Sequence, residues 1–141
     1  MRHHLLALVA LAACGSASNE PSPDAATCTP PATGTAPTYT ELYATYFAPN
    51  TPGHCATAGC HADPGHATWS CGTTKDACYA GMVGVGLIDP ANPRASQIAD
   101  PKRSPLSWIN AGGGMPQDAV APLPEARDAI LAWVAACAPN N

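Results

Sequence analysis

Two cysteines and two histidines lie close together near the middle of this chain. Residues 54–61 read His-Cys-Ala-Thr-Ala-Gly-Cys-His, so four residues separate Cys55 from Cys60, and His61 follows directly. A thiolate is a nucleophile and a metal ligand, and neutral imidazole is the commonest metal ligand among side chains. This order of residues therefore indicates a covalent attachment site or a metal site rather than a packed core element.

Haem of the c type is attached by the same residue types in the same order. In Cys-x-x-Cys-His, both thiols form thioether bonds to the haem vinyl groups, and the histidine is an axial ligand of the iron. Here the spacer between Cys55 and Cys60 has four residues instead of two. The longer spacer leaves open the alternative that these two cysteines form a disulfide and that no haem is bound.

A second axial ligand is available from a loop further along the chain. Residues 111–116 read Ala-Gly-Gly-Gly-Met-Pro, which excludes regular structure and presents Met115 on a flexible loop. A thioether is a soft, neutral ligand, and a His/Met pair raises the reduction potential of the iron. Met82 is the alternative ligand if this loop folds away. We expect His54 and His66 to be solvated, and we do not favour zinc because a second paired-ligand element is missing.

Two amphipathic helices are predicted to flank these residues. Thr38 and Glu41 have the spacing of a capping box, and apolar side chains then recur at helical spacing until a proline, which predicts a helix over 39–48. A second helix is predicted over 124–137, with proline at its first position and an apolar stripe along one face. The stripe consists of Ala126, Ala129, Ile130, Trp133, Val134 and Cys137.

The intervening residues 62–107 show no strong periodicity. Five prolines interrupt them, and the apolar run 81–88 contains three glycines. That run predicts a loop, or a backbone that passes close to a flat object, rather than a good strand. Helical turns are expected at 96–98 and 104–109. We expect residues 81–88 and Trp108 to shield a bound haem from water.

The N-terminus indicates export and a lipid anchor. Residues 5–13 form an uninterrupted apolar run after a short basic start. A bilayer span needs about 20 residues, so this run is too short and has the size of a signal-peptide core. It ends in Leu-Ala-Ala-Cys, which resembles the lipobox of bacterial lipoproteins and implies a signal peptide over 1–13 and lipidation of Cys14. A plain secretory signal is the alternative, and both imply a compartment in which disulfides persist.

The rest of the chain divides into a tether and one domain. Residues 14–37 are rich in Ser, Ala, Thr and Pro, which favours a flexible tether. Residues 38–141 are expected to form one domain, because the whole chain has 141 residues. The whole chain has 16 prolines and 12 glycines, so that domain should be small and mainly α, with short helices and long loops. The net charge of −4 provides no basic surface for nucleic acid.

In order and rough separation, these features resemble a class I cytochrome c domain over residues 39–137. That family has an N-terminal helix, the attachment Cys and Cys-His, a loop region, a Met-Pro pair and a C-terminal helix with a Trp-aliphatic pair. The resemblance implies thioether bonds through Cys55 and Cys60, His61 as the proximal ligand and Met115 as the distal ligand. It also implies one covalently attached haem c.

The remaining cysteines are expected to form disulfides. Of seven cysteines, Cys14 is assigned to lipid and Cys55 and Cys60 to haem, which leaves four cysteines and three ways to pair them. We predict a local Cys71–Cys78 disulfide and a Cys28–Cys137 disulfide that joins the tether to the C-terminal helix.

The sequence thus predicts a lipid-anchored electron carrier of the bacterial cell envelope, periplasmic or at the outer membrane, and not an enzyme. It would pass single electrons to a redox partner protein, and its acidic composition favours a partner with a basic surface. The alternative is a disulfide-stapled lipoprotein with a cytochrome-like fold and no haem, which serves as a binding or structural module.

Overall fold

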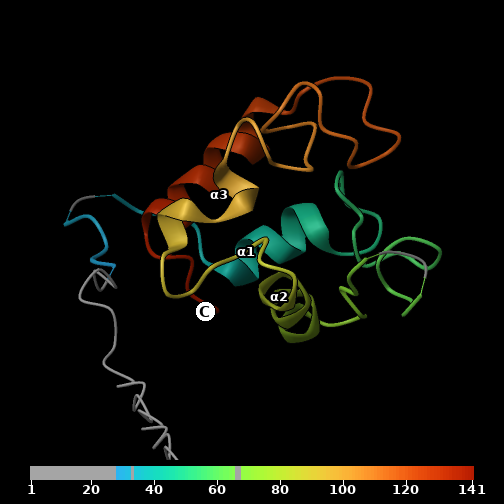
Figure 1. Ribbon diagram of the computed structural model, residues 1–141, viewed down its shortest axis with the longest axis horizontal. Helices are drawn as coiled ribbons and strands as arrows, with labels where there is room; N and C mark the ends of the chain where they lie inside the picture. Colours follow the sequence, from blue (N-terminus) through green and yellow to red (C-terminus); the bar gives the residue numbers. More distant parts are fainter. Residues whose placement is uncertain (1–27, 33, 66–67) are drawn as a thin grey trace, which may run out of the picture.

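The computed structural model describes residues 28–32, 34–65 and 68–141. Within this part of the chain the fold is small and mainly α, as predicted, and contains no strand. An isolated bridge joins Leu106 to Met115. The elements shown in Figure 1 are α1 (Tyr39–Leu42), the π-helical turn η1 (Tyr43–Phe47), α2 (Lys75–Gly84), the 3-10 turns η2 (Pro93–Ala95) and η3 (Gln97–Ala99), and α3 (Pro124–Ala135).

The helix predicted over 39–48 begins at the expected residue and changes form after one turn. Thr38 Oγ1 accepts a hydrogen bond from the Glu41 N–H at 3.1 Å, and Glu41 Oε2 accepts one from the Thr38 N–H at 2.7 Å. The capping box is therefore confirmed. Helix α1 then widens into η1, which ends before Ala48. Ala48 is extended because it precedes a proline, whose ring disfavours helical backbone at the residue before it.

Helix α3 confirms the C-terminal prediction, but it ends two residues early, at Ala135. Cys137 and Ala138 have φ angles of 76° and 45°, which a right-handed helix cannot accommodate. The stacking of Tyr39 on Trp133, with ring centroids 5.3 Å apart, packs α1 against α3. The fully buried side chains of α3 belong to the predicted stripe and are Ala126, Ile130, Trp133 and Val134.

The prediction of a loop over 81–88 is wrong in its first half, because residues 81–84 belong to α2. Thr74 caps the first turn of α2 through its hydroxyl, and Cys78 and Met82 are buried in the core. Glycine is a poor helix former, so the glycines at 81 and 84 hide this helix in the sequence. Only a glycine fits at 81, because a Cβ there would collide with the neighbouring loop.

The predicted turns at 96–98 and 104–109 correspond to short hydrogen-bonded turns. Residues 97–99 form η3. The N–H groups of Ile109 and Asn110 both donate to the Leu106 carbonyl, at 3.1 and 2.9 Å.

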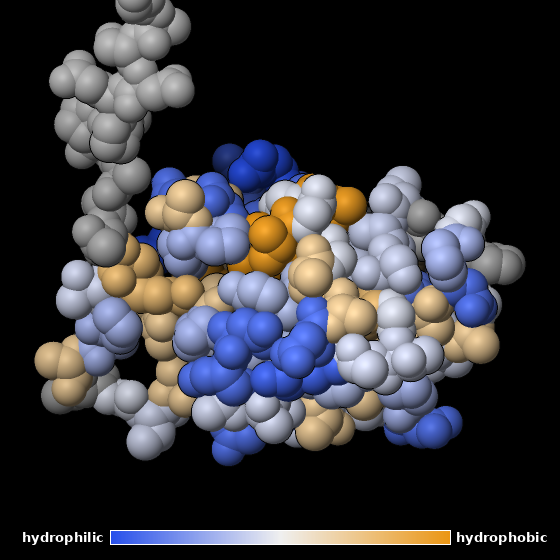
Figure 2. All heavy atoms as spheres, turned by 90° about the horizontal axis from the view of Figure 1, so that it is seen from below, coloured by the Kyte–Doolittle hydropathy of each residue, from blue (hydrophilic) through white to orange (hydrophobic). Residues whose placement is uncertain are grey.

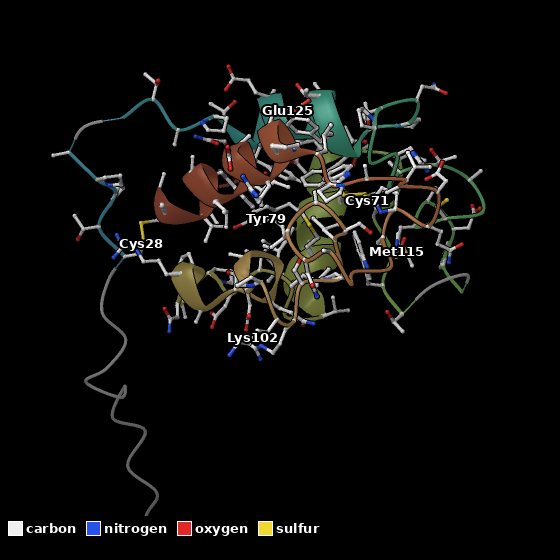
Figure 3. All side chains as sticks on the ribbon, turned by 90° about the horizontal axis from the view of Figure 1, so that it is seen from above. Cys28, Cys71, Tyr79, Lys102, Met115 and Glu125 are labelled. Carbon is white, nitrogen blue, oxygen red and sulfur yellow. A yellow bond between two sulfur atoms is a disulfide. The ribbon has the colours of Figure 1, made fainter. Side chains whose placement is uncertain are left out.

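Both predicted disulfides are present. One joins Cys28 to Cys137, and the other joins Cys71 to Cys78. Figure 3 shows that Cys28 and Met115 lie at opposite ends of the molecule. The segment before α1 is therefore fixed far from the Met115 loop.

Several expectations fall on residues outside the described part of the chain. They are the signal peptide over 1–13, the lipidation of Cys14, most of the tether over 14–37, and His66. None of the helices in the described part is long and apolar enough to cross a membrane.

The face seen in Figure 2 mixes polar and apolar side chains, and the most strongly hydrophobic colour is confined to a small area near its upper centre. In the described part of the chain, the exposed large apolar side chains are Val85, Val120 and Leu131. Scattered apolar residues of this kind are normal on a soluble domain and do not by themselves mark a docking surface.

Candidate functional site

One cavity collects the four side chains that the sequence assigns to a haem site. It has a volume of about 300 Å³ and is lined by Cys55, Cys60, His61 and Met115 together with their chain neighbours. That volume is at the lower end of the range for small-molecule sites, roughly 300–1,000 Å³. A smaller cavity of about 120 Å³ is also lined by Cys55, His61 and Met115.

The segment between the two cysteines coils into a compact turn. The His61 N–H donates to the Cys55 carbonyl at 3.1 Å, and the Cys60 N–H donates to the Thr57 carbonyl at 3.0 Å. Gly59 supplies the φ of 79° that this turn requires. The four spacer residues thus form a closed turn, and the backbone of His61 lies next to that of Cys55.

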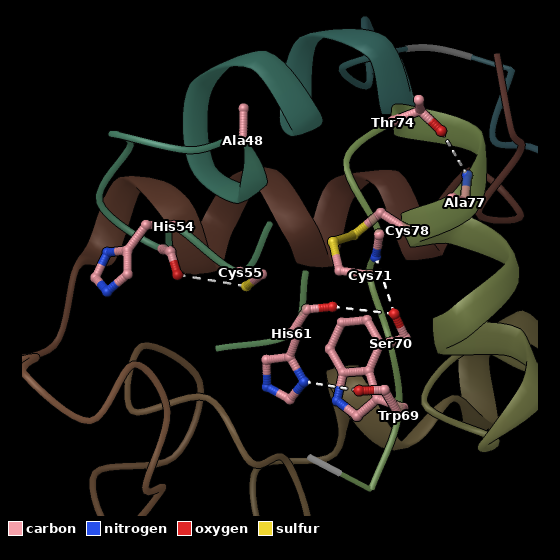
Figure 4. Close-up of a disulfide and its surroundings, with 12 residues drawn as sticks. Ala48, His54, Cys55, His61, Trp69, Ser70, Cys71, Thr74, Ala77 and Cys78 are labelled. Carbon is pink, nitrogen blue, oxygen red and sulfur yellow. Dashed lines mark hydrogen bonds between the residues drawn. A yellow bond between two sulfur atoms is a disulfide. The ribbon is translucent and has the colours of Figure 1, made fainter. Parts of the chain in front are cut away.

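The His61 side chain is buried and held in one orientation. Its Nδ1 lies 3.1 Å from the Trp69 carbonyl oxygen, and its ring stacks on the Trp69 ring with centroids 4.2 Å apart (Figure 4). A carbonyl oxygen can only accept, so Nδ1 carries the proton of this bond, and in the neutral ring the free lone pair is therefore on Nε2. Histidines that bind metals commonly have this second hydrogen bond, which fixes their tautomer and their ring orientation. His61 is therefore prepared to act as a metal ligand through Nε2.

Cys55 and Cys60 are free thiols, so the structure does not contain the disulfide that the longer spacer left open. Cys55 Sγ lies 3.4 Å from the Gly53 carbonyl oxygen. Burial, with a smaller contribution from the nearby Cys60 thiol, raises the pKa of Cys55 to about 12. Burial at this position therefore favours the neutral thiol over the thiolate.

Met115 is held in place, contrary to the expectation of a flexible loop. Its N–H donates to the Pro105 carbonyl at 2.8 Å, and its carbonyl accepts from the Ser107 N–H at 2.6 Å. Gly113 lies so close to the Leu106 carbonyl, 2.6 Å from an added Cβ, that no larger residue fits there. Gly113 therefore permits close packing of the loop against residues 106 and 107, which fixes the Met115 backbone beside the cavity.

The other predicted participants lie around the smaller cavity or next to it. Met82 is buried and lines the smaller cavity, as does Leu87 from the run 81–88. Trp108 lines neither cavity and instead packs on Tyr46, with ring centroids 5.9 Å apart. Only part of the expected shield therefore lines the cavities directly.

A side-chain contact that the sequence did not suggest joins two segments that line the larger cavity. His54 Nε2 lies 3.4 Å from Asp118 Oδ1, and His54 Nδ1 lies 3.2 Å from the Thr51 carbonyl oxygen. The expectation that His54 is solvated is therefore wrong, because its side chain is half-buried and contacts an oxygen at each nitrogen. The contact of Trp69 with His61 was not predicted either, because nothing in the surrounding sequence indicates where a single tryptophan of an irregular segment lies.

This donor set fits a c-type haem. One cavity offers an imidazole nitrogen, a thioether sulfur and two thiols, and the smaller cavity beside it has buried apolar walls. Those walls include Phe47, Leu87 and Ile98. In the described part of the chain, no three His, Cys, Asp or Glu side chains converge as a metal site of their own.

The chain matches no family model, no curated protein and no solved structure. Its function is therefore inferred from the site itself.

Proposed function

We propose that this protein is a c-type cytochrome with one covalently attached haem, which passes single electrons to a partner protein and is not itself an enzyme. The observation that carries the proposal is the common cavity of His61 and Met115, with two free thiols on its wall. A disulfide-stapled module without a cofactor has no use for two free thiols beside an oriented imidazole. The site therefore favours the cytochrome over this alternative.

Each residue would have a distinct role toward the bound group. Cys55 and Cys60 would hold it through thioether bonds, His61 would bind the iron through Nε2, and Met115 would supply the second iron ligand through its sulfur. The haem iron supplies reversible one-electron chemistry. The buried walls of the smaller cavity would exclude water, and the soft Met115 sulfur would favour the reduced iron, so both features would raise the reduction potential.

The location and the partner follow from charge and from the cysteines. We propose that lipid on Cys14 anchors the protein in the bacterial cell envelope, on the periplasmic side or at the outer membrane. The two disulfides agree with an oxidising compartment. The net charge of −4 would steer the protein toward a basic surface on its redox partner.

A haem-stained denaturing gel of the protein, made together with c-type maturation factors, tests this proposal. Haem that stays with the chain through denaturation is expected for the natural sequence and for Met115→Ala, because Met115 makes no covalent bond. The double variant Cys55→Ser/Cys60→Ser should lose the stain. A colourless natural protein in which peptide mapping finds Cys55 joined to Cys60 would support the cofactor-free module instead.

A further inference from the structure

His61 is hydrogen-bonded to one neighbouring segment at both its side chain and its backbone. The N–H groups of Cys71 and Gly72 donate to the His61 carbonyl at 2.6 and 3.2 Å, and Ser70 Oγ donates to the same oxygen at 3.2 Å. The Trp69 carbonyl accepts from the His61 ring. Four consecutive residues, 69–72, therefore bond to His61 at its backbone carbonyl and at Nδ1. We call this segment the clamp.

The clamp has little regular structure of its own and is fixed by α2. The Cys71–Cys78 disulfide bonds it covalently to the first half of that helix, and both cysteines are fully buried. Further along α2, Gly81 lies against the clamp, where an added Cβ would collide with the Ser70 carbonyl and lie 3.2 Å from the Trp69 ring. Figure 4 shows the disulfide between α2 and the part of the clamp that faces His61.

We propose that the Cys71–Cys78 disulfide is a positioning device for His61. It holds the clamp in place and thereby fixes the hydrogen bond from Nδ1 to the Trp69 carbonyl. This hydrogen bond raises the basicity of the imidazole as a ligand, and a more basic ligand favours the oxidised iron. Loss of the disulfide should therefore loosen the clamp and raise the reduction potential. This effect on the potential depends on the proposed function, whereas the effect on the clamp does not.

The second disulfide provides a matched control. Cys28–Cys137 closes a loop with a sequence separation of 109, against 7 for Cys71–Cys78, so its removal should weaken the fold more. It lies at the opposite end of the molecule from Met115 (Figure 3). If both disulfides only stabilised the fold, the loss of Cys28–Cys137 would have the larger effect at every readout.

The experiment compares Cys71→Ala/Cys78→Ala with Cys28→Ala/Cys137→Ala by two readouts. The first is amide hydrogen exchange at positions 71 and 72 in the haem-free chain, where we expect at least a tenfold acceleration in the first variant and none in the second. The second readout is the reduction potential of the haem-loaded protein, which should rise only in the first variant. Equal effects of the two variants at these readouts, or no effect of the first, would overturn the proposal.

Ser70→Ala keeps the test decisive if the first variant fails to fold. The Ser70 hydroxyl donates to the His61 carbonyl and accepts from the Gly72 N–H at 3.2 Å, and its removal leaves the disulfide intact. Faster exchange at Gly72 and a smaller rise in potential are expected, and no change in either would refute the clamp. If the natural protein takes up no haem, the proposed function fails, while the exchange measurement still decides whether the disulfide positions His61.

Discussion

The hydroxyl of Tyr39 is buried between α1 and α3 without a hydrogen-bond partner. The whole side chain is inaccessible to solvent, and its ring stacks on Trp133 at 5.3 Å and meets the edge of Tyr79 at 5.2 Å. Burial raises the pKa of Tyr39 well above its usual value, so the group stays protonated up to strongly alkaline pH. The hydroxyl thus loses its hydration on folding and gains no bond in return.

The substitution Tyr39→Phe removes this hydroxyl and keeps every ring contact. An unsatisfied buried polar group costs about 1–3 kcal/mol. We therefore expect Tyr39→Phe to raise the free energy of unfolding by about 1 kcal/mol. For a domain of this size, that increase corresponds to a rise in Tm of roughly 4 °C.

Tyr79→Phe is the matched control in the same aromatic cluster. The Tyr79 hydroxyl donates to the Ala138 carbonyl at 2.9 Å, so its removal leaves that carbonyl unpaired and should lower stability by about 1 kcal/mol. Both variants are compared with the natural sequence by urea denaturation with the disulfides intact. If Tyr39→Phe is destabilised as much as Tyr79→Phe, the Tyr39 hydroxyl has a partner and the reasoning is refuted.

The cysteines give further predictions. Because burial raises the pKa of Cys55 to about 12 from 9.0, alkylation of Cys55 in the haem-free protein at pH 8 should be about a thousandfold slower than that of an ordinary thiol, as mass spectrometry can measure. As the pH rises, the Cys55 thiol loses its proton in the unfolded chain before it does so in the folded chain. The contribution of Cys55 to stability should therefore be complete below pH 9 and lost as the pH rises toward 12. A free energy of unfolding that does not change with pH over this range would contradict this prediction. On the chain-entropy model, alanine pairs that replace Cys28–Cys137 and Cys71–Cys78 should cost about 5 and 2.5 kcal/mol in urea denaturation. If the loss of Cys71–Cys78 cost more than the loss of Cys28–Cys137, the entropy of loop closure in the unfolded chain would not explain the stabilisation.

The two ends of the domain could be predicted from local signals. The capping box of α1 and the apolar stripe of α3 depend on residues three or four apart, and such patterns are visible in a single sequence. Once lipid and haem were assigned, four cysteines and three possible pairings remained, and the predicted pairing is the one that is present. The two helices could be predicted because their formation depends little on contacts that are remote in the chain.

The middle of the domain could not be predicted, because long-range contacts determine it. Helix α2 contains glycines that weaken its local signal, yet Gly81 is what lets the helix lie against the clamp. Trp69 has no pattern around it and gains its role only from its position opposite His61. The contact of His54 with Asp118 joins residues that are remote in sequence, so local spacing gave no sign of it.

The absorption spectrum of the haem-loaded Met115→Ala variant tests the central claim most directly. A methionine ligand gives a weak sulfur-to-iron absorption band, and Met82→Ala serves as the control because Met82 also lines the smaller cavity. We expect Met115→Ala to lose this band and Met82→Ala to keep it. A band that persists in Met115→Ala would show that His61 and Met115 do not share the iron.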